Sequence, residues 1–167
     1  PETPAFAFDS GPGNVLMDEW IARHRGRNYD EQGSWARGGM VHKALLAKLQ
    51  QDAYFSKGAP KSTGRELFNS AWLESKLKSF NQPVTPVDVQ ATLAQLTIQT
   101  LVNALKEHGE PEEIYVCGGG AHNSVLMEGL ANALATRIVS TTETLGIHPD
   151  WVAVSYTHLT LPTMIRV

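Results

Sequence analysis

Three consecutive glycines, Gly118 to Gly120, separate an apolar run from an amphipathic run in the sequence V-C-G-G-G-A-H-N. The apolar residues Ile114 to Val116 predict a short strand, and leucines at helical spacing predict a helix that starts at His122 or Asn123. A glycine turn between a strand and a helix brings backbone N–H groups and a helix N-terminus close to an anionic or nucleotide ligand. The same pattern fits a plain tight turn in an α/β unit, and the glycines alone favour neither interpretation.

A second turn of this kind lies near the N-terminus, where residues 8–14 read F-D-S-G-P-G-N. Ala5 to Phe8 are apolar and predict a short buried strand, and the residues from Val15 onward predict a helix with Asn14 at its N-cap. Asp9 falls at the carboxyl end of this strand, where open α/β sheets place ligand-contacting residues, although an aspartate there also suits a structural turn. Two such turns in one chain predict a ligand held between two elements.

Length and composition exclude several classes of protein. The 167 residues, of which 42% are hydrophobic and 19% charged, fit one ordinary globular domain, and a net charge near −3 gives no basic surface for nucleic acid. No apolar run approaches the roughly 20 residues of a membrane span, so we expect no membrane partner. The one cysteine, Cys117, excludes an internal disulfide and is expected to be a small core residue. The six histidines form no metal-ligand pattern, so no metal site is predicted, and the cytoplasm is the expected compartment.

Between the two glycine turns the sequence is mostly helical. A helix is predicted over Arg37 to Gln50, with four apolar residues on one face: Met40, Leu45, Leu46 and Leu49. Thr63 and Glu66 form a capping-box pattern that predicts the next helix start. Thr85 and Pro86 predict the start of a long helix that runs to Gly109. Its apolar face repeats at helical spacing through Val89, Leu93, Leu96, Thr100, Leu101, Ala104 and Leu105.

The rest of the chain predicts a strand, a helix and a strand. The strands are expected at Ile114 to Cys117 and at Arg137 to Ser140, with a helix over 123–135 between them. The predicted order is therefore β, several helices, β, α, β, which is typical of an α/β fold. A final helix is expected after Pro149 and Asp150.

The last residues, 153–167, do not continue this pattern. The segment V-S-Y-T-H-L-T-L-P-T at 154–163 has no helical period and resembles the translation of a transposase sequencing adaptor. Our hypothesis is that protein-coding sequence stops at Val152 and that 153–167 is a non-native tail, with an ordinary β-hairpin tail as the alternative. The chain does not begin with methionine, and we expect residues 1–152 to be cut from a longer protein.

Five segments, in order, resemble the C-terminal half of the anhydro-N-acetylmuramic acid kinase family. They are F-D-S-G-P-G-N at 8–14, P-K-S-T-G-R-E-L-F-N at 60–69, D-V-Q-A-T-L-A-Q-L-T at 88–97, V-C-G-G-G-A-H-N at 116–123 and T-T-E-T-L-G-I-H-P-D-W-V at 141–152. The resemblance covers about residues 5–152. It implies a helix-rich α/β fold, the C-terminal lobe of an actin-like (ribonuclease H-like) sugar kinase, incomplete at both ends. In such kinases two similar lobes close on ATP.

The resemblance implies a reaction and a set of site residues. The reaction is ATP- and Mg²⁺-dependent phosphorylation of 1,6-anhydro-N-acetylmuramic acid, with hydrolytic opening of the anhydro ring to N-acetylmuramic acid 6-phosphate, in peptidoglycan recycling. The glycine turn would lie against the adenosine end of ATP, which assigns four residues: Gly118, Gly119, Gly120 and Asn123. Asn123 is expected both to cap the helix and to hydrogen-bond the ligand. Four others would line the cleft near the phosphates or their Mg²⁺: Asp9, Gly11, Gly13 and Asn14. The partners implied are ATP and a small sugar. The resemblance also allows the longer parent protein to form a homodimer.

Departures from the family bear on activity. The family's N-terminal phosphate loop, its second phosphate-binding turn and its general-base aspartate would all precede Pro1, so no catalytic residue is assigned. Ala153 stands where the family has a glutamate. Without a base and both phosphate turns, we expect the isolated fragment to be inactive. Lys61, Ser62 and Arg65 could contact phosphate, but a solvated helix cap is the favoured interpretation.

Two alternatives stay open. A different actin-like amino-sugar kinase would keep C-G-G-G-A-H-N but not P-K-S-T-G-R-E-L-F-N, whose presence counts against it. A non-enzymatic, sugar-sensing regulator built on a kinase lobe would need a DNA-binding arm, and no basic recognition helix is visible. A glycine-rich phosphate loop in upstream sequence would favour the enzyme, and a helix-turn-helix would favour the regulator.

Overall fold

The computed structural model describes residues 7–108 and 111–155, with side chains described as far as Val152. Within these ranges the α-helices are α1 (Val15–Arg25), α2 (Ser34–Arg37), α3 (Lys43–Gln50), α4 (Ser70–Phe80), α5 (Pro86–Glu107), α6 (Ser124–Ala133) and α7 (Pro149–Ser155). The strands are β1 (Glu113–Val116) and β2 (Ile138–Thr141), and the 3₁₀ turns are η1 (Glu31–Gly33), η2 (Gly119–His122) and η3 (Thr142–Leu145). None of the helices in the described ranges has both the length and the apolar composition to cross a membrane.

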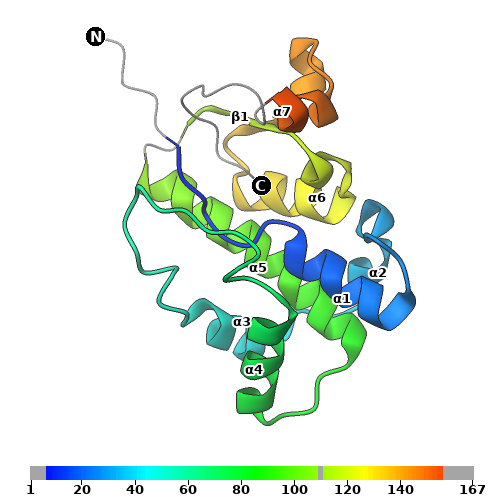
Figure 1. The fold of residues 1–167 in the computed structure, drawn as a ribbon. Helices are drawn as coiled ribbons and strands as arrows, with labels where there is room; N and C mark the ends of the chain where they lie inside the picture. The colour runs from blue at the N-terminus through cyan, green and yellow to red at the C-terminus, as the bar shows by residue number, and fades with distance from the viewer. Residues whose placement is uncertain (1–6, 109–110, 156–167) are drawn as a thin grey trace.

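The two strands and the helix between them form a parallel β–α–β unit. The strands β1 and β2 pair in parallel, with Glu113 opposite Ile138 and Val116 opposite Thr141, and α6 makes the crossover. Both strands and the crossover helix lie within two residues of the predicted bounds, so this part of the α/β prediction is confirmed. In Figure 1 the unit lies on one side of the long helix α5.

Helix α5 runs through the middle of the molecule, and helices α1, α2, α3 and α6 contact it (Figure 1). Its start follows the predicted cap, because the Thr85 side chain accepts a hydrogen bond from the backbone N–H of Asp88, and Pro86 occupies the first turn. The apolar residues predicted to share a face are all buried. A helix buried on most sides must be covered by several elements, which accounts for the arrangement of the other helices.

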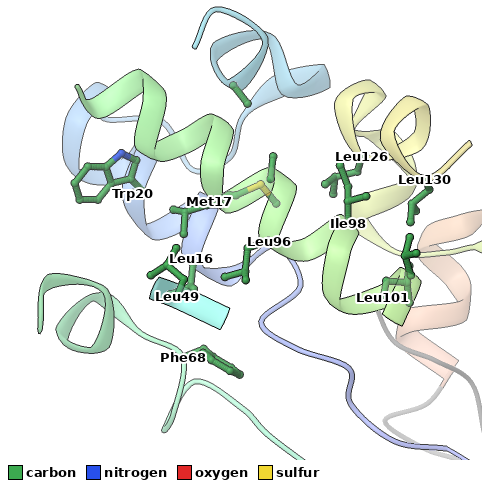
Figure 2. Packing of buried hydrophobic residues seen from close by; sticks show 14 of the residues in the cluster. Leu16, Met17, Trp20, Leu49, Phe68, Leu96, Ile98, Leu101, Leu126 and Leu130 are labelled. Atoms are coloured by element: carbon green, nitrogen blue, oxygen red, sulfur yellow. The ribbon is translucent and has the colours of Figure 1, made fainter. Parts of the chain in front are cut away.

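The hydrophobic core lies on two sides of α5. Figure 2 shows Leu16 and Met17 of α1 beside Leu96, and Leu126 and Leu130 of α6 beside Ile98 and Leu101. These side chains belong to one buried cluster, so the N-terminal helices and the β–α–β unit share a single core.

The continuous helix predicted over residues 37–50 is wrong. Helix α2 ends at Arg37 and α3 begins at Lys43, with His42 as its N-cap. Gly38 and Gly39 break the helix, since glycine has low helix propensity. Met40 lies in this break and is 77% exposed, whereas Leu45 and Leu49 are buried as predicted.

The capping box predicted at Thr63 and Glu66 is also wrong. Helix α4 begins at Ser70, and its N-cap is Asn69, whose side chain accepts a hydrogen bond from the N–H of Trp72. The backbone N–H of Thr63 instead donates to the Asp9 carboxylate, a partner 54 residues away. The Thr63 N–H, which the predicted capping box would have paired with the Glu66 side chain, is therefore used in a long-range hydrogen bond.

Both ends of the described chain differ in detail from the prediction. Half of the strand predicted at Ala5 to Phe8 lies outside the described residues, and the other half, Ala7 and Phe8, is not in a strand. The final helix is expected after Pro149 and Asp150 and is expected to be missing from this chain, but α7 begins at Pro149 and runs through Ser155, two residues into the segment predicted to be non-helical. The rest of that segment lies outside the described residues.

Substitution of Leu96 by alanine tests the shared core. Leu96 has no exposed surface, so Leu96→Ala should lower the free energy of unfolding by about 2–5 kcal/mol, measured by urea denaturation. As a control, Leu145→Ala removes a side chain that is 55% exposed and should change stability by no more than about 0.5 kcal/mol. Similar losses in the two variants would contradict this core.

Candidate functional site

The glycine turn after β1 is fixed at both of its ends. Gly118 has φ 72° and ψ −166°, a conformation that only glycine adopts readily, and its N–H donates to the carbonyl of Pro149 at 3.0 Å. After η2, Asn123 caps helix α6, since its Oδ1 accepts from the N–H groups of Val125 at 3.1 Å and Leu126 at 3.2 Å. The predicted cap is confirmed. Capping occupies Oδ1, so contact with a ligand would fall to the Asn123 amide nitrogen.

The turn at residues 8–14 meets this glycine turn through Asn14. Asn14 stands at the N-cap position of α1 as predicted, but its side chain makes no capping hydrogen bond. Its Oδ1 is buried and has no hydrogen-bond partner among the described residues, and its Nδ2 lies 3.2 Å from the place a Cβ on Gly119 would occupy. The fold therefore brings together the two turns that the sequence singled out.

A cavity of about 520 Å³ opens between the two turns, and we name it the glycine-turn cavity. Three segments line it: Asn14 to Asp18 at the start of α1, the loop 28–32, and the residues Gly119, His122 and Asn123. Of the four residues assigned to the adenosine end, Gly119 and Asn123 line this cavity, whereas Gly118 and Gly120 do not line it.

A second cavity of about 440 Å³ lies beside the first, and we name it the Arg65 cavity. It is lined by the turn 9–15 and by the segment from Thr63 to Arg65. Asn14 and Asp18 line both cavities, so the two are neighbours. All four residues assigned to the phosphate end line the Arg65 cavity: Asp9, Gly11, Gly13 and Asn14.

Asp9 joins the segment 61–65 to the turn. One carboxylate oxygen, Oδ2, accepts from the Ser62 hydroxyl at 3.1 Å and from the Thr63 N–H at 2.9 Å, and the Asp9 N–H donates to the Lys61 carbonyl at 3.0 Å. Ser62 is therefore a partner of Asp9 and caps no helix, which corrects the favoured interpretation of this segment. Of its two basic residues, Arg65 lines the cavity, while the Lys61 ammonium lies 5.1 Å from the ring centre of Tyr54.

Asp18 stands where the two cavities meet. Burial raises the pKa of its carboxyl from 3.8 to about 6. Arg65 lowers the pKa and partly offsets this effect, and the charge of Asp30 raises it further. The sequence marked Asp18 only as an acidic residue suited to a first helical turn, because its burial depends on residues more than ten positions away.

The loop 28–32 was missed by the sequence analysis. Its anchor is Asp30, 5% exposed, whose carboxylate accepts from the N–H groups of Trp35 at 2.8 Å and Ala36 at 2.9 Å and from Gln90 Nε2 at 3.2 Å. Gly26 and Gly33, both with positive φ, bracket this loop. A pair of glycines around a polar segment was the available signal, but it does not reveal the buried anchor.

His122 connects the glycine turn to helix α7. Its Nε2 lies 2.9 Å from Asp150 Oδ1, and both side chains are more than half exposed. Together with the hydrogen bond between Gly118 and Pro149, this contact ties the segment H-P-D at 148–150 to the segment G-G-G-A-H at 118–122.

A parallel β–α–β unit whose glycine turn faces a cavity defines an α/β protein of the kind that places ligands at the carboxyl ends of its strands. The family is given by comparison with known proteins. The model of the anhydro-N-acetylmuramic acid kinase family matches residues 1–167, and the chain belongs to this family.

Three curated relatives, each named anhydro-N-acetylmuramic acid kinase, show how much of the protein the chain covers. The relative from Pseudomonas fluorescens (strain Pf0-1) is 49% identical over 153 residues, which are 91% of this chain and 42% of the relative. That from Haemophilus influenzae is 46% identical over 163 residues, 91% of this chain and 43% of the relative. That from Nitrosospira multiformis is 49% identical over 145 residues, 86% of this chain and 39% of the relative. The chain spans less than half the length of these relatives.

Substitution of Asp18 by asparagine tests the electrostatics between the cavities. The folded chain holds the Asp18 proton up to about pH 6, whereas the unfolded chain releases it near pH 3.8, so ionisation makes wild-type stability fall as pH rises through this window. Asp18→Asn removes this effect. The stability of the variant relative to wild type should therefore rise by roughly 1–2 kcal/mol between pH 4 and pH 7, measured by urea denaturation. A stability difference between Asp18→Asn and wild type that does not change with pH would contradict the raised pKa of Asp18.

Proposed function

We propose that this chain forms the C-terminal lobe of an actin-like sugar kinase and supplies the nucleotide half of its active site. The observation that carries the proposal is the meeting of the two glycine turns at the glycine-turn cavity. Family membership supports the kinase assignment, since each relative bears that name. The alternatives of another amino-sugar kinase or a sugar-sensing regulator find less support, because neither is the name of these relatives.

The residues of the glycine-turn cavity fit the adenosine part of ATP. The buried Asn14 Oδ1, which has no hydrogen-bond partner, can accept a hydrogen bond from an amino or hydroxyl group of a ligand. Gly119 offers backbone without a Cβ, so a ligand can approach the main chain there. Asn28, Gln32 and Asn123 add carboxamides, which donate and accept hydrogen bonds in one plane, as the edge of a nucleobase does.

The Arg65 cavity fits the phosphates and their metal ion. The Arg65 guanidinium matches phosphate oxygens, and Asp9 and Asp18 supply carboxylates. No group of three or more metal-binding side chains occurs in the described part of the chain. Mg²⁺ in kinases is held by one or two carboxylates together with phosphates and water, so a full protein cage is not required.

The proposed reaction follows from the family name and from the chemistry of the bicyclic sugar. ATP provides the γ-phosphoryl group, water adds at C1 of 1,6-anhydro-N-acetylmuramic acid, and the C1–O6 bond breaks. The oxygen left on C6 receives the phosphoryl group, which gives N-acetylmuramic acid 6-phosphate and ADP. We assign the base that activates the water to the part of the protein that precedes this chain, and expect the chain alone to be inactive and the reaction to take place in the cytoplasm.

Substitution of Gly119 by valine tests the nucleotide site. The new Cβ would lie 3.2 Å from Asn14 Nδ2, and the rest of the side chain would enter the cavity. We expect ATP affinity to fall at least tenfold, roughly 1.4 kcal/mol, in NMR titrations of this chain. The same loss is expected calorimetrically in a chimera that joins residues 1–152 to the preceding part of the Pseudomonas fluorescens relative, while binding of the anhydro sugar stays within a few-fold.

Gly58→Val is the matched control. A Cβ added to Gly58 has no atom within 4 Å, so this variant should bind ATP as wild type does. Normal ATP binding by a correctly folded Gly119→Val protein would show that the turn is merely structural. Failure of both the unaltered chain and the chimera to bind ATP would contradict the proposed function itself.

A further inference from the structure

We propose that the loop 28–32 is the nucleobase-recognition wall of the glycine-turn cavity and that Tyr29 stacks on the base. The inference rests on the proposed function and names the residue that would distinguish a nucleotide from a bare polyphosphate. It is carried by three observations: how the loop is held, what it presents to the cavity, and how charge is distributed between the two cavities.

The loop is built to hold one conformation. The Asp30 carboxylate, buried at 5% exposure, accepts from two backbone N–H groups and from Gln90 of helix α5. Gln32 has φ 52°, which a residue other than glycine adopts only where its surroundings enforce it. Gly33 follows with φ 68°, and a Cβ there would lie 2.5 Å from Asn123 Oδ1. The loop therefore packs directly against the residue that caps α6.

This rigid loop presents an aromatic ring at the edge of the cavity. Tyr29 is 63% exposed although it lines the glycine-turn cavity and a neighbouring cavity of about 300 Å³. An exposed aromatic ring on a fixed loop is a stacking surface, because little conformational entropy is lost when a planar ligand covers it. Asn28 and Gln32, on either side of Tyr29 and Asp30, place carboxamides where they can meet the polar edge of such a ligand.

The charges of the two cavities fix the direction of the ligand. The ionisable side chains around the glycine-turn cavity are Asp18, Asp30, Glu31, Tyr29 and His122, so carboxylates predominate there. A triphosphate would be repelled by these carboxylates, whereas a neutral base would not. The Arg65 cavity is lined by Asp9 and Asp18 as well, but it also has a guanidinium that can pair with phosphate, and the Asp9 carboxylate already accepts two hydrogen bonds from Ser62 and Thr63. The nucleotide therefore lies with its base against Tyr29 and its phosphates toward Arg65, across the shared residues Asn14 and Asp18.

Titrations of this chain with ATP and with inorganic tripolyphosphate, followed by NMR, test the inference. Tyr29→Ala should weaken ATP binding about tenfold, which corresponds to roughly 1.4 kcal/mol and lies within the range measured for base–aromatic stacking. Tyr29→Phe keeps the ring and should stay within twofold of wild type. Tripolyphosphate has no base, so its affinity should be the same in all three proteins. Tyr115→Ala, which removes a tyrosine that lines neither cavity, is the matched control and should leave ATP binding unchanged.

Three outcomes would overturn the inference. Wild-type ATP affinity in Tyr29→Ala would show that the ring does not contact the base. An equal loss for ATP and tripolyphosphate would show that the substitution disturbs the whole site. Weaker binding of the anhydro sugar with unchanged ATP binding would assign the ring to the sugar. If neither the unaltered chain nor the chimera binds ATP, the proposed function fails and the inference with it, whereas loss of ATP binding in Gly119→Val but not in Tyr29→Ala removes the inference alone.

Discussion

Helix α5 is buried along most of its length, and two of its buried polar residues, Gln90 and Thr97, donate hydrogen bonds to segments outside the helix. Gln90 donates to Asp30 and thereby fixes the loop 28–32. About two turns further on, Thr97 donates to the carbonyl of Gly13 at 2.7 Å and fixes the turn that carries Asn14. On the side of α6, Ile98 and Leu101 pack against the helix that follows the glycine turn (Figure 2). One helix thus positions all three segments that line the glycine-turn cavity.

This dependence explains why the loop 28–32 can hold a buried carboxylate. An ionised group in a core is tolerated only where several donors surround it, and removing one of them leaves an uncompensated charge. The donors of Asp30 come from two places, the start of α2 and the first two turns of α5, and the donor on α5, Gln90, is 60 residues away from Asp30 in the chain. The loop is therefore tied to two helices, and a ligand that contacts the loop meets a surface that these hydrogen bonds already hold in place.

Elements with strong local signals could be predicted from the sequence. The start of α5 at Thr85 and Pro86, the cap at Asn123 and the two parallel strands all rest on neighbouring residues, and the structure confirms them. Features that depend on partners distant in the sequence could not be predicted in this way. Ser62 and Thr63 look like a helix cap until Asp9 is placed beside them, and Asn14 looks like a cap until its side chain is seen at the glycine turn. In the candidate site, the sequence singled out both turns, whereas the burial of Asp18 and the hydrogen bonds of Asp30 could be seen only in the packed structure.

Two of the segments that resemble the kinase family, 116–123 and 141–152, are separate in the sequence but meet at the glycine turn. The H-P-D segment at 148–150 reaches it twice, through the Pro149 carbonyl, which accepts from the Gly118 N–H, and through Asp150, which pairs with His122. Gly118 has a conformation that other residues avoid, so a fixed partner for its N–H helps to keep the turn in this shape. The exposed His122–Asp150 pair contributes little to overall stability. Its effect is local, because it holds the His122 side chain, which lines the cavity, against helix α7. Helix α7 therefore supports the glycine turn from one side, and α5 supports it from the other side through α6.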